Sequence, residues 1–98
     1  MRFGLSQHEY ELLENLVVKP LRERGAVVWC FGSRARGTQH KFSDIDLMVD
    51  TTTDLSPLIA QLVEDIVESH FPYKVDIVQR IDFAQSYLSG YERDKVEY

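Results

Sequence analysis

The sequence contains a single cysteine and no long run of apolar residues. Because Cys30 is the only cysteine, no disulfide can form within the chain, and its place in the apolar segment AVVWCF predicts a buried, unreactive thiol. No apolar run approaches the roughly 20 residues that cross a bilayer, and the N-terminal segment MRFGLSQHEYE lacks the apolar core of a signal peptide. These absences argue against a membrane span or a membrane partner and predict a cytoplasmic protein.

The sequence also has fewer basic residues than acidic ones. The chain has 11 Lys and Arg against 16 Asp and Glu, for a formal net charge of −5, whereas general nucleic-acid binding needs a basic surface that neutralises phosphates. No repeat, linker or low-complexity segment interrupts the 98 residues, which predicts one domain over residues 1–98. A domain of this size buries only about 60–65% of its unfolded surface, so a partner or a second copy would stabilise it.

Three strands and three helices are predicted from the hydrophobic pattern and the turn residues. The apolar segment Ala26 to Phe31 is typical of a buried strand, and residues 44–50 and 73–79 alternate between apolar and other side chains. The predicted helix starts are a capping box of Ser6 and Glu9, the N-cap Ser56 followed by Pro57, and a capping box of Asp82 and Gln85. Pro20 is expected to kink or split the first helix, and Gly25 to end it. The order α-β-β-α-β-α predicts a small α/β (α+β) domain with helices packed on a mixed sheet.

Three aspartates on two of these strands indicate a metal site. Asp44 and Asp46 are two residues apart on a strand, so both carboxylates project from the same face. Asp76 lies between the core-facing Val75 and Ile77, so its side chain also leaves by the face opposite the core. Such a pair on an edge strand is often only a solvated surface, but three converging carboxylates suit Mg²⁺ or Mn²⁺ and a two-metal phosphoryl-transfer site.

The segment before the aspartate pair supplies groups that bind anions. Gly32 allows the backbone to approach a ligand closely, and Ser33 offers a hydroxyl and an amide donor at the start of an expected helical turn. One of the two arginines that follow is expected to contact phosphate, with Arg36 favoured over Arg34. Lys74, on the third strand, is predicted either to neutralise the neighbouring carboxylate or to contact substrate. Cations would then hold an anionic substrate, and carboxylates the metals that activate it.

The motif has a known counterpart. The pattern resembles the nucleotidyltransferase superfamily that includes DNA polymerase beta. It consists of Gly-Ser, ten intervening residues and Asp-x-Asp, followed by a later strand with the sequence VDIV. Over its full length the chain is similar to the minimal nucleotidyltransferases (MNT), which are usually encoded beside a HEPN-domain protein. The resemblance implies the polymerase beta catalytic-core fold in a single minimal domain. It also implies an enzyme that uses two Mg²⁺ ions and ATP.

The resemblance assigns roles to individual residues. Gly32 and Ser33 match the motif that holds the β- and γ-phosphates, while Asp44 and Asp46 match the two metal-binding carboxylates. Asp76 matches the third carboxylate, which binds the catalytic metal and helps to deprotonate the attacking hydroxyl. The implied reaction is in-line attack of a hydroxyl on the α-phosphate of a nucleoside triphosphate, with release of pyrophosphate.

The resemblance also implies a partner. In MNT–HEPN toxin–antitoxin pairs the MNT transfers AMP from ATP to a tyrosine of the HEPN toxin, so we expect an antitoxin that forms a hetero-oligomer with such a protein. Two alternatives stay open: a non-catalytic antitoxin that neutralises its HEPN partner by binding, and an enzyme that modifies a small molecule. The C-terminal aromatics Phe83, Tyr87 and Tyr91 share a helical stripe, which indicates either core packing or contact with the partner.

Overall fold

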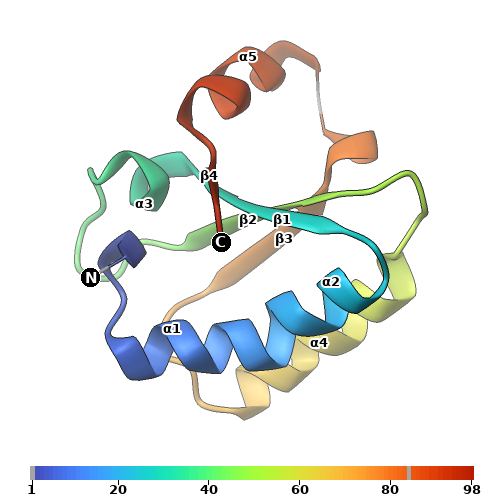
Figure 1. Cartoon of the computed structure of the whole chain (residues 1–98). Helices are drawn as coiled ribbons and strands as arrows, with labels where there is room; N and C mark the ends of the chain where they lie inside the picture. The colour runs from blue at the N-terminus through green and yellow to red at the C-terminus, as the bar shows by residue number, and fades with distance from the viewer. Residues whose placement is uncertain (1, 84) are drawn as a thin grey trace.

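The computed structural model describes residues 2–83 and 85–98, which form a four-stranded mixed sheet with helices on both faces (Figure 1). The strands are β1 (Val27–Phe31), β2 (Ile45–Asp50), β3 (Val75–Gln79) and β4 (Val96–Glu97). Their order across the sheet is β3-β2-β1-β4, with β1 antiparallel to both β2 and β4, and β3 parallel to β2. The predicted α/β (α+β) class with a mixed sheet is confirmed.

The N-terminal helical segment follows its sequence signals closely. The helices are η1 (Arg2–Gly4), α1 (Gln7–Leu13), the π-helix η2 (Glu14–Val18) and α2 (Lys19–Glu23). The capping box is present, because Ser6 Oγ accepts from the Glu9 N–H at 3.1 Å and Glu9 Oε1 accepts from the Ser6 N–H at 2.8 Å. Pro20 has no N–H to donate. The helix does not break at this residue, because the preceding turns in η2 widen into a π-helix. Gly25, with φ +84°, follows the end of α2.

The remaining helices include one short helix that was not predicted, and the others start one residue or more away from the predicted positions. They are α3 (Gly32–Arg36), α4 (Ser56–Glu68), η3 (Arg80–Asp82) and α5 (Gln85–Asp94). Ser56 is the first residue of α4 rather than its N-cap, which is Leu55. The Asp54 carboxylate accepts from the Ser56 N–H at 3.0 Å and holds the helix start instead. The hydroxyl of Ser56, the side chain of Gln79 and the backbone of Ser56 all bond to Asp54 and lower the pKa of its carboxyl to about 2.

The prediction that Asp82 caps the last helix is wrong. Asp82 lies inside η3, and the backbone is extended at the next residue, Phe83, before α5 begins at Gln85. Strand β4 was also absent from the predicted order, because a two-residue strand leaves no readable pattern. It pairs with β1 and brings Tyr98 against Tyr10, whose ring centroid is 4.4 Å away. No helix among the described residues has the length and apolar character needed to span a bilayer.

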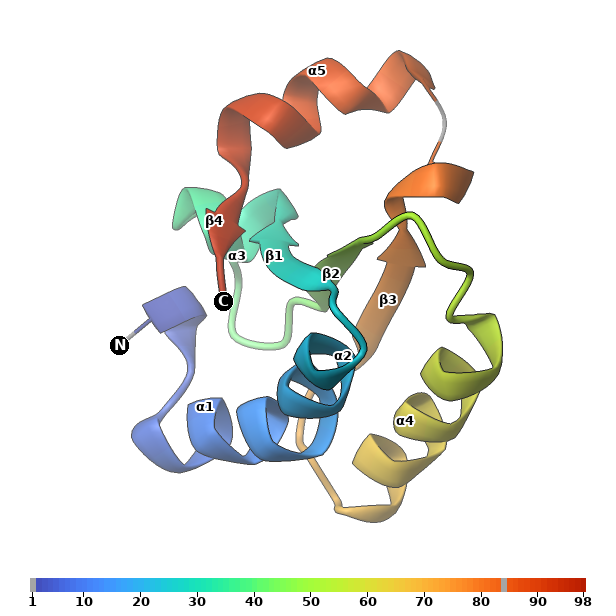
Figure 2. The same cartoon turned by 45° about the vertical axis from the view of Figure 1, so that its right-hand side comes forward.

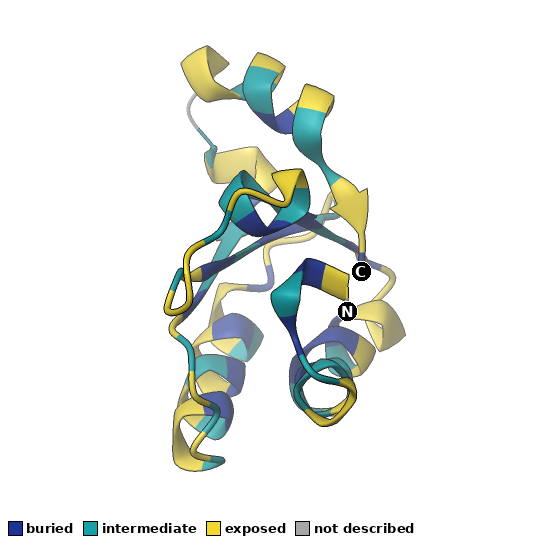
Figure 3. Ribbon diagram, turned by 90° about the vertical axis from the view of Figure 1, so that its left-hand side faces the viewer, coloured by how far each residue is buried: buried dark blue, intermediate teal, exposed yellow. Residues whose placement is uncertain are grey.

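The main core lies between the sheet and the helical segments α1–α2 and α4 (Figure 1). Ile45, Leu47 and Val49 of β2 are completely buried there, as their alternation predicted, and so is Cys30 of β1. Burial, followed by the charge of Asp46, raises the pKa of the Cys30 thiol to about 12. The buried positions of α1 and α4 are turned toward the interior (Figure 3). The predicted inert cysteine is therefore confirmed as a core residue.

The opposite face of the sheet is covered by α3 and by α5, which runs across it from the end of β3 to β4 (Figure 2). Met48, which points away from the main core, is completely buried under this layer. Phe31 packs edge-on against both Phe83 and Tyr91, with ring centroids 5.6 Å apart in each pair. Of the aromatic stripe, Tyr91 is buried while Tyr87 is 65% exposed. Core packing therefore accounts for part of the stripe and leaves Tyr87 outside it.

Candidate active site

Strand register places two of the predicted carboxylates beside each other. Asp46 of β2 pairs with Asp76 of the parallel strand β3, and with Phe31, the last residue of β1, on its other side. These residues share the sheet face under α5, because Asp46 and Asp76 alternate with core-facing neighbours. Asp44 is exposed and immediately precedes β2. The structure thus brings Asp46 and Asp76 together at the end of β1, with Asp44 at the entrance to β2.

Gly32 is required at this position by both its conformation and its surroundings. Its φ is +74°, in the left-handed region that L side chains rarely adopt, and an added Cβ would lie 2.5 Å from Asp46 Oδ2. The chain then turns at once into α3, whose first turn contains Ser33 and whose end is marked by Gly37 at φ +77°. The Ser33 carbonyl accepts from the Gly37 N–H and the Thr38 N–H. The Gly-Ser motif is therefore held as a short turn against Asp46.

The three aspartates share one electrostatic environment. Burial raises the pKa of Asp46, and the charges of Asp76 and Asp44 raise it further. Lys74 and Arg36 oppose this shift, so both cations lie within electrostatic range of the Asp46 carboxylate. A bound cation would stabilise the charged form of a half-buried carboxylate that has two other carboxylates nearby.

Lys74 contacts the third aspartate. Its Nζ lies 3.5 Å from Asp76 Oδ1, and the two side chains are 70% and 40% exposed. Of the two roles predicted for Lys74, the structure contains the neutralising contact. A solvent-exposed ion pair contributes little to the stability of the fold. Its main effect is to offset part of the negative charge of the site.

The two arginines of the motif lie in different environments. Arg34 is only 3% exposed; its Nη1 donates to the Phe3 carbonyl at 2.8 Å and its Nε to the Ser43 carbonyl at 3.0 Å. Its guanidinium also stacks on the ring of Tyr73, 4.3 Å from the centroid. Arg34 therefore ties the motif loop to the N-terminus, and these contacts argue against the phosphate-binding alternative. Arg36 is exposed and its Nη1 lies 3.3 Å from Asp94 Oδ2.

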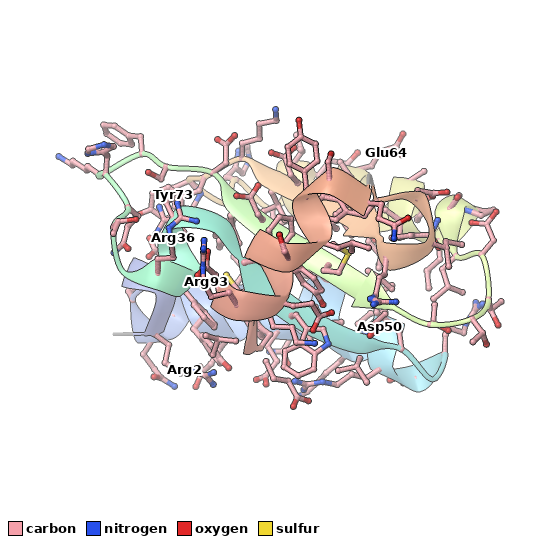
Figure 4. The ribbon with its side chains drawn as sticks, turned by 90° about the horizontal axis from the view of Figure 1, so that it is seen from above. Arg2, Arg36, Asp50, Glu64, Tyr73 and Arg93 are labelled. Carbon is pink, nitrogen blue, oxygen red and sulfur yellow. The ribbon has the colours of Figure 1, made fainter. Side chains whose placement is uncertain are left out.

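A cavity of about 430 Å³ opens between α3 and α5 and continues the site. Its lining comprises Phe31, Gly32, Arg36, Phe83, Tyr87, Gly90, Tyr91, Arg93 and Asp94. We call it the α3–α5 cavity. At one end the Asp94 carboxylate binds both Arg36 and Arg93, which lie close together in Figure 4. The contribution of Asp94 is absent from the sequence motif, because its contact with Arg36 spans 58 residues of chain.

The donor set at this site fits a hard divalent cation. It consists of carboxylate oxygens, which Mg²⁺ and Mn²⁺ prefer, and the absence of a Cβ on Gly32 lets Asp46 Oδ2 lie close to the backbone of the turn. Within residues 2–83 and 85–98, no three acidic, histidine or cysteine side chains already stand close enough together to hold a metal. Carboxylates repel one another when no cation lies between them. The strand register places two candidate ligands, Asp46 and Asp76, side by side.

Comparison with known proteins decides the family. A family model described as a nucleotidyltransferase domain matches residues 10–98. The chain belongs to this nucleotidyltransferase family. The predicted superfamily and the prediction of an enzyme are confirmed.

Two relatives and two solved structures illustrate the likeness. A candidate protein adenylyltransferase of Methanocaldococcus jannaschii, MJ1215, is 37% identical over 76 residues, 78% of this chain and 80% of the relative. A second, MntA of Haemophilus influenzae, is 40% identical over 52 residues, 52% of this chain and 46% of the relative. A toxin–antitoxin crystal structure with AMP-PNP aligns with TM-score 0.67 and 26% identity, covering 86% of this chain and 70% of that one. A variant MntA–HpeT toxin–antitoxin structure aligns with TM-score 0.65 and 26% identity, covering 87% and 70%.

Proposed function

We propose that this nucleotidyltransferase transfers AMP from ATP to a tyrosine hydroxyl of a HEPN-domain toxin and thereby acts as its antitoxin. The pairing of Asp46 with Asp76 beside the Gly32 turn is the observation that carries the proposal. The names of the two relatives support protein adenylylation, and the similar crystal structures support a toxin partner.

The residues of this site have separate roles in the proposed reaction. The turn at Gly32 and Ser33 receives the β- and γ-phosphates, and Arg36 adds a charge-assisted hydrogen bond. Asp44, Asp46 and Asp76 would hold Mg²⁺, which when bound neutralises charge on the transferred phosphoryl group. The acceptor oxygen forms a bond to the α-phosphorus as the bond to the β-phosphate oxygen breaks, and pyrophosphate leaves. In this proposal Asp76 takes the hydroxyl proton.

A binding-only antitoxin is the second candidate. It is favoured by the exposed apolar side chains near the start of α5, where Ile81 is 56% and Tyr87 is 65% exposed. Side chains of this kind often mark a partner surface. In that case the complex forms and neutralises the toxin without nucleotide transfer.

Intact-mass measurements on the purified chain and a candidate HEPN partner separate the two functions. Each nucleoside triphosphate is added in turn with Mg²⁺. We expect the partner to gain one or more AMP units with ATP, and the gain to disappear when EDTA replaces Mg²⁺, because the carboxylates alone cannot neutralise the phosphates. A stable complex with unchanged partner mass would instead establish the binding-only function.

Arg36→Ala should raise the KM for ATP about tenfold with a smaller effect on kcat. The expected loss corresponds to roughly 1.4 kcal/mol of a charge-assisted hydrogen bond made equally in the ground and transition states. Steady-state transfer kinetics measure it. Arg24→Ala, in the exposed turn after α2, is the matched control and should leave both constants unchanged. An unchanged KM in Arg36→Ala would remove Arg36 from the phosphate site.

A further inference from the structure

Of the tyrosines in this chain, one lies on the exposed surface. The sequence contains five tyrosines, and all five are among the described residues. Tyr91 and Tyr98 are 3% and 4% exposed, and burial raises the pKa of Tyr91 to about 12. Tyr10 and Tyr73 are half-buried and pack against other aromatic rings. Only Tyr87 of these five belongs to the exposed surface.

Tyr87 also lines the cavity that begins at the nucleotide-binding turn. It shares the α3–α5 cavity with Gly32, and its ring lies 6.0 Å from that of Phe83. The cavity has a basic end, where Asp94 of α5 binds Arg36. At 1.5 Å per residue, Tyr87 lies about 10 Å along the helix from Asp94. The start of α5 follows η3 after the Gln79 end of β3 (Figure 2), whereas the third carboxylate, Asp76, is the second residue of that strand.

This order along the cavity suits an in-line displacement. The attacking and leaving oxygens must lie on opposite sides of the transferred phosphorus. With the β- and γ-phosphates at the Gly32 turn and Arg36, the leaving group occupies the basic end. The acceptor must then approach from the other side of the cavity, whose lining includes Tyr87 in the first turn of α5.

We infer that Tyr87 is an acceptor for the chain's own nucleotidyltransferase activity, so that the protein adenylylates itself within one molecule. The inference rests on the proposed function, which supplies ATP as the donor. Tyr87 Oη forms a bond to the α-phosphorus, the bond to the β-phosphate oxygen breaks, and pyrophosphate leaves. The phenolic proton passes to a site carboxylate and from there to solvent, leaving a tyrosyl phosphodiester of AMP.

The charge at the basic end of the cavity matches this product. Arg36 and Arg93 contribute two guanidinium groups, and Asp94 contributes one carboxylate. Their sum is one positive charge, which favours the binding of an anionic phosphate group in this cavity. The modified tyrosine would occupy the same cavity as the donor, so self-modification would compete with transfer to a partner.

The test uses the full chain alone with ATP and Mg²⁺, followed by intact mass and peptide mapping. We expect a gain of one AMP unit on the peptide that contains Tyr87. Tyr87→Phe, which keeps the ring against Phe83, should lower this modification at least tenfold. Tyr73→Phe is the matched control, because it removes a half-buried tyrosine hydroxyl elsewhere, and it should be modified like the wild type.

Four results would overturn the inference. A mass gain that persists in Tyr87→Phe would place the acceptor elsewhere. An unmodified chain that still adenylylates its partner would remove self-modification but leave the proposed function intact, whereas no transfer to either protein would remove both. A tagged Asp46→Asn copy mixed with wild type should stay unmodified, and its modification would contradict transfer within one molecule.

Discussion

Asp46→Asn should lower nucleotide transfer by about a thousandfold or more while leaving the fold at least as stable as the wild type. Neutralising charge on a transferring phosphoryl group is worth several kcal/mol, and each 1.36 kcal/mol corresponds to a factor of about ten in rate. The substitution removes one of the two register-paired carboxylates. It also relieves repulsion, because burial and the charges of Asp76 and Asp44 raise the pKa of Asp46.

The measurement combines the transfer rate with the free energy of unfolding in denaturant. Asp50→Asn is the matched control, since Asp50 is another half-buried carboxylate of β2 on the same face, paired with Val27 instead of Phe31. It should retain transfer. If Asp46→Asn lost activity together with its cooperative unfolding transition, the role assigned to the carboxylate would be unsupported. Retained transfer in a folded Asp46→Asn protein would contradict it.

The same pair of proteins has a defined pH dependence of stability. Because the folded-state pKa of Asp46 is raised above its ordinary value of 3.8, the folded chain binds this proton more tightly than the unfolded chain. The free energy of unfolding of the wild type relative to Asp46→Asn should therefore fall as pH rises from about 3.8 through the raised pKa. Below that window the two proteins should differ least, because both side chains are then neutral.

Gly32→Ala should abolish transfer and destabilise the fold by more than the cost of the backbone conformation alone. A left-handed alanine costs about 1–2 kcal/mol, and here the new Cβ would also approach Asp46 Oδ2 to 2.5 Å. The carboxylate must move away, which disrupts the site in addition to the strain. Denaturant unfolding and the transfer rate report the two effects separately.

Gly37→Ala is the matched control for backbone strain. Gly37 has φ +77° at the other end of α3, and an added Cβ there meets nothing within 4 Å. It should cost about 1–2 kcal/mol of stability and retain transfer. Equal stability losses at Gly32 and Gly37 with full activity in both would show that the contact with Asp46 is unimportant.

Some features could be predicted from the sequence because they depend on neighbours a few residues apart. The capping box of Ser6 and Glu9, the inward face of β2 and the short turn after Gly32 all follow from local periodicity or local hydrogen bonding. The prediction for Asp82 failed for a related reason. A capping pattern only shows which residues are able to cap, whereas the chain after β3 forms η3 first.

The sequence by itself determined the family, the acidic and glycine positions of the motif, and the order of its main helices and strands. Only the tertiary structure decided that Asp46 pairs with Asp76, that Arg34 is buried while Arg36 faces the cavity, and that Asp94 holds Arg36. It also decided that the C-terminus adds β4 to the sheet. The physical reason is range: periodicity and capping act over a few residues, whereas register, burial and ion pairs depend on which distant segments pack together.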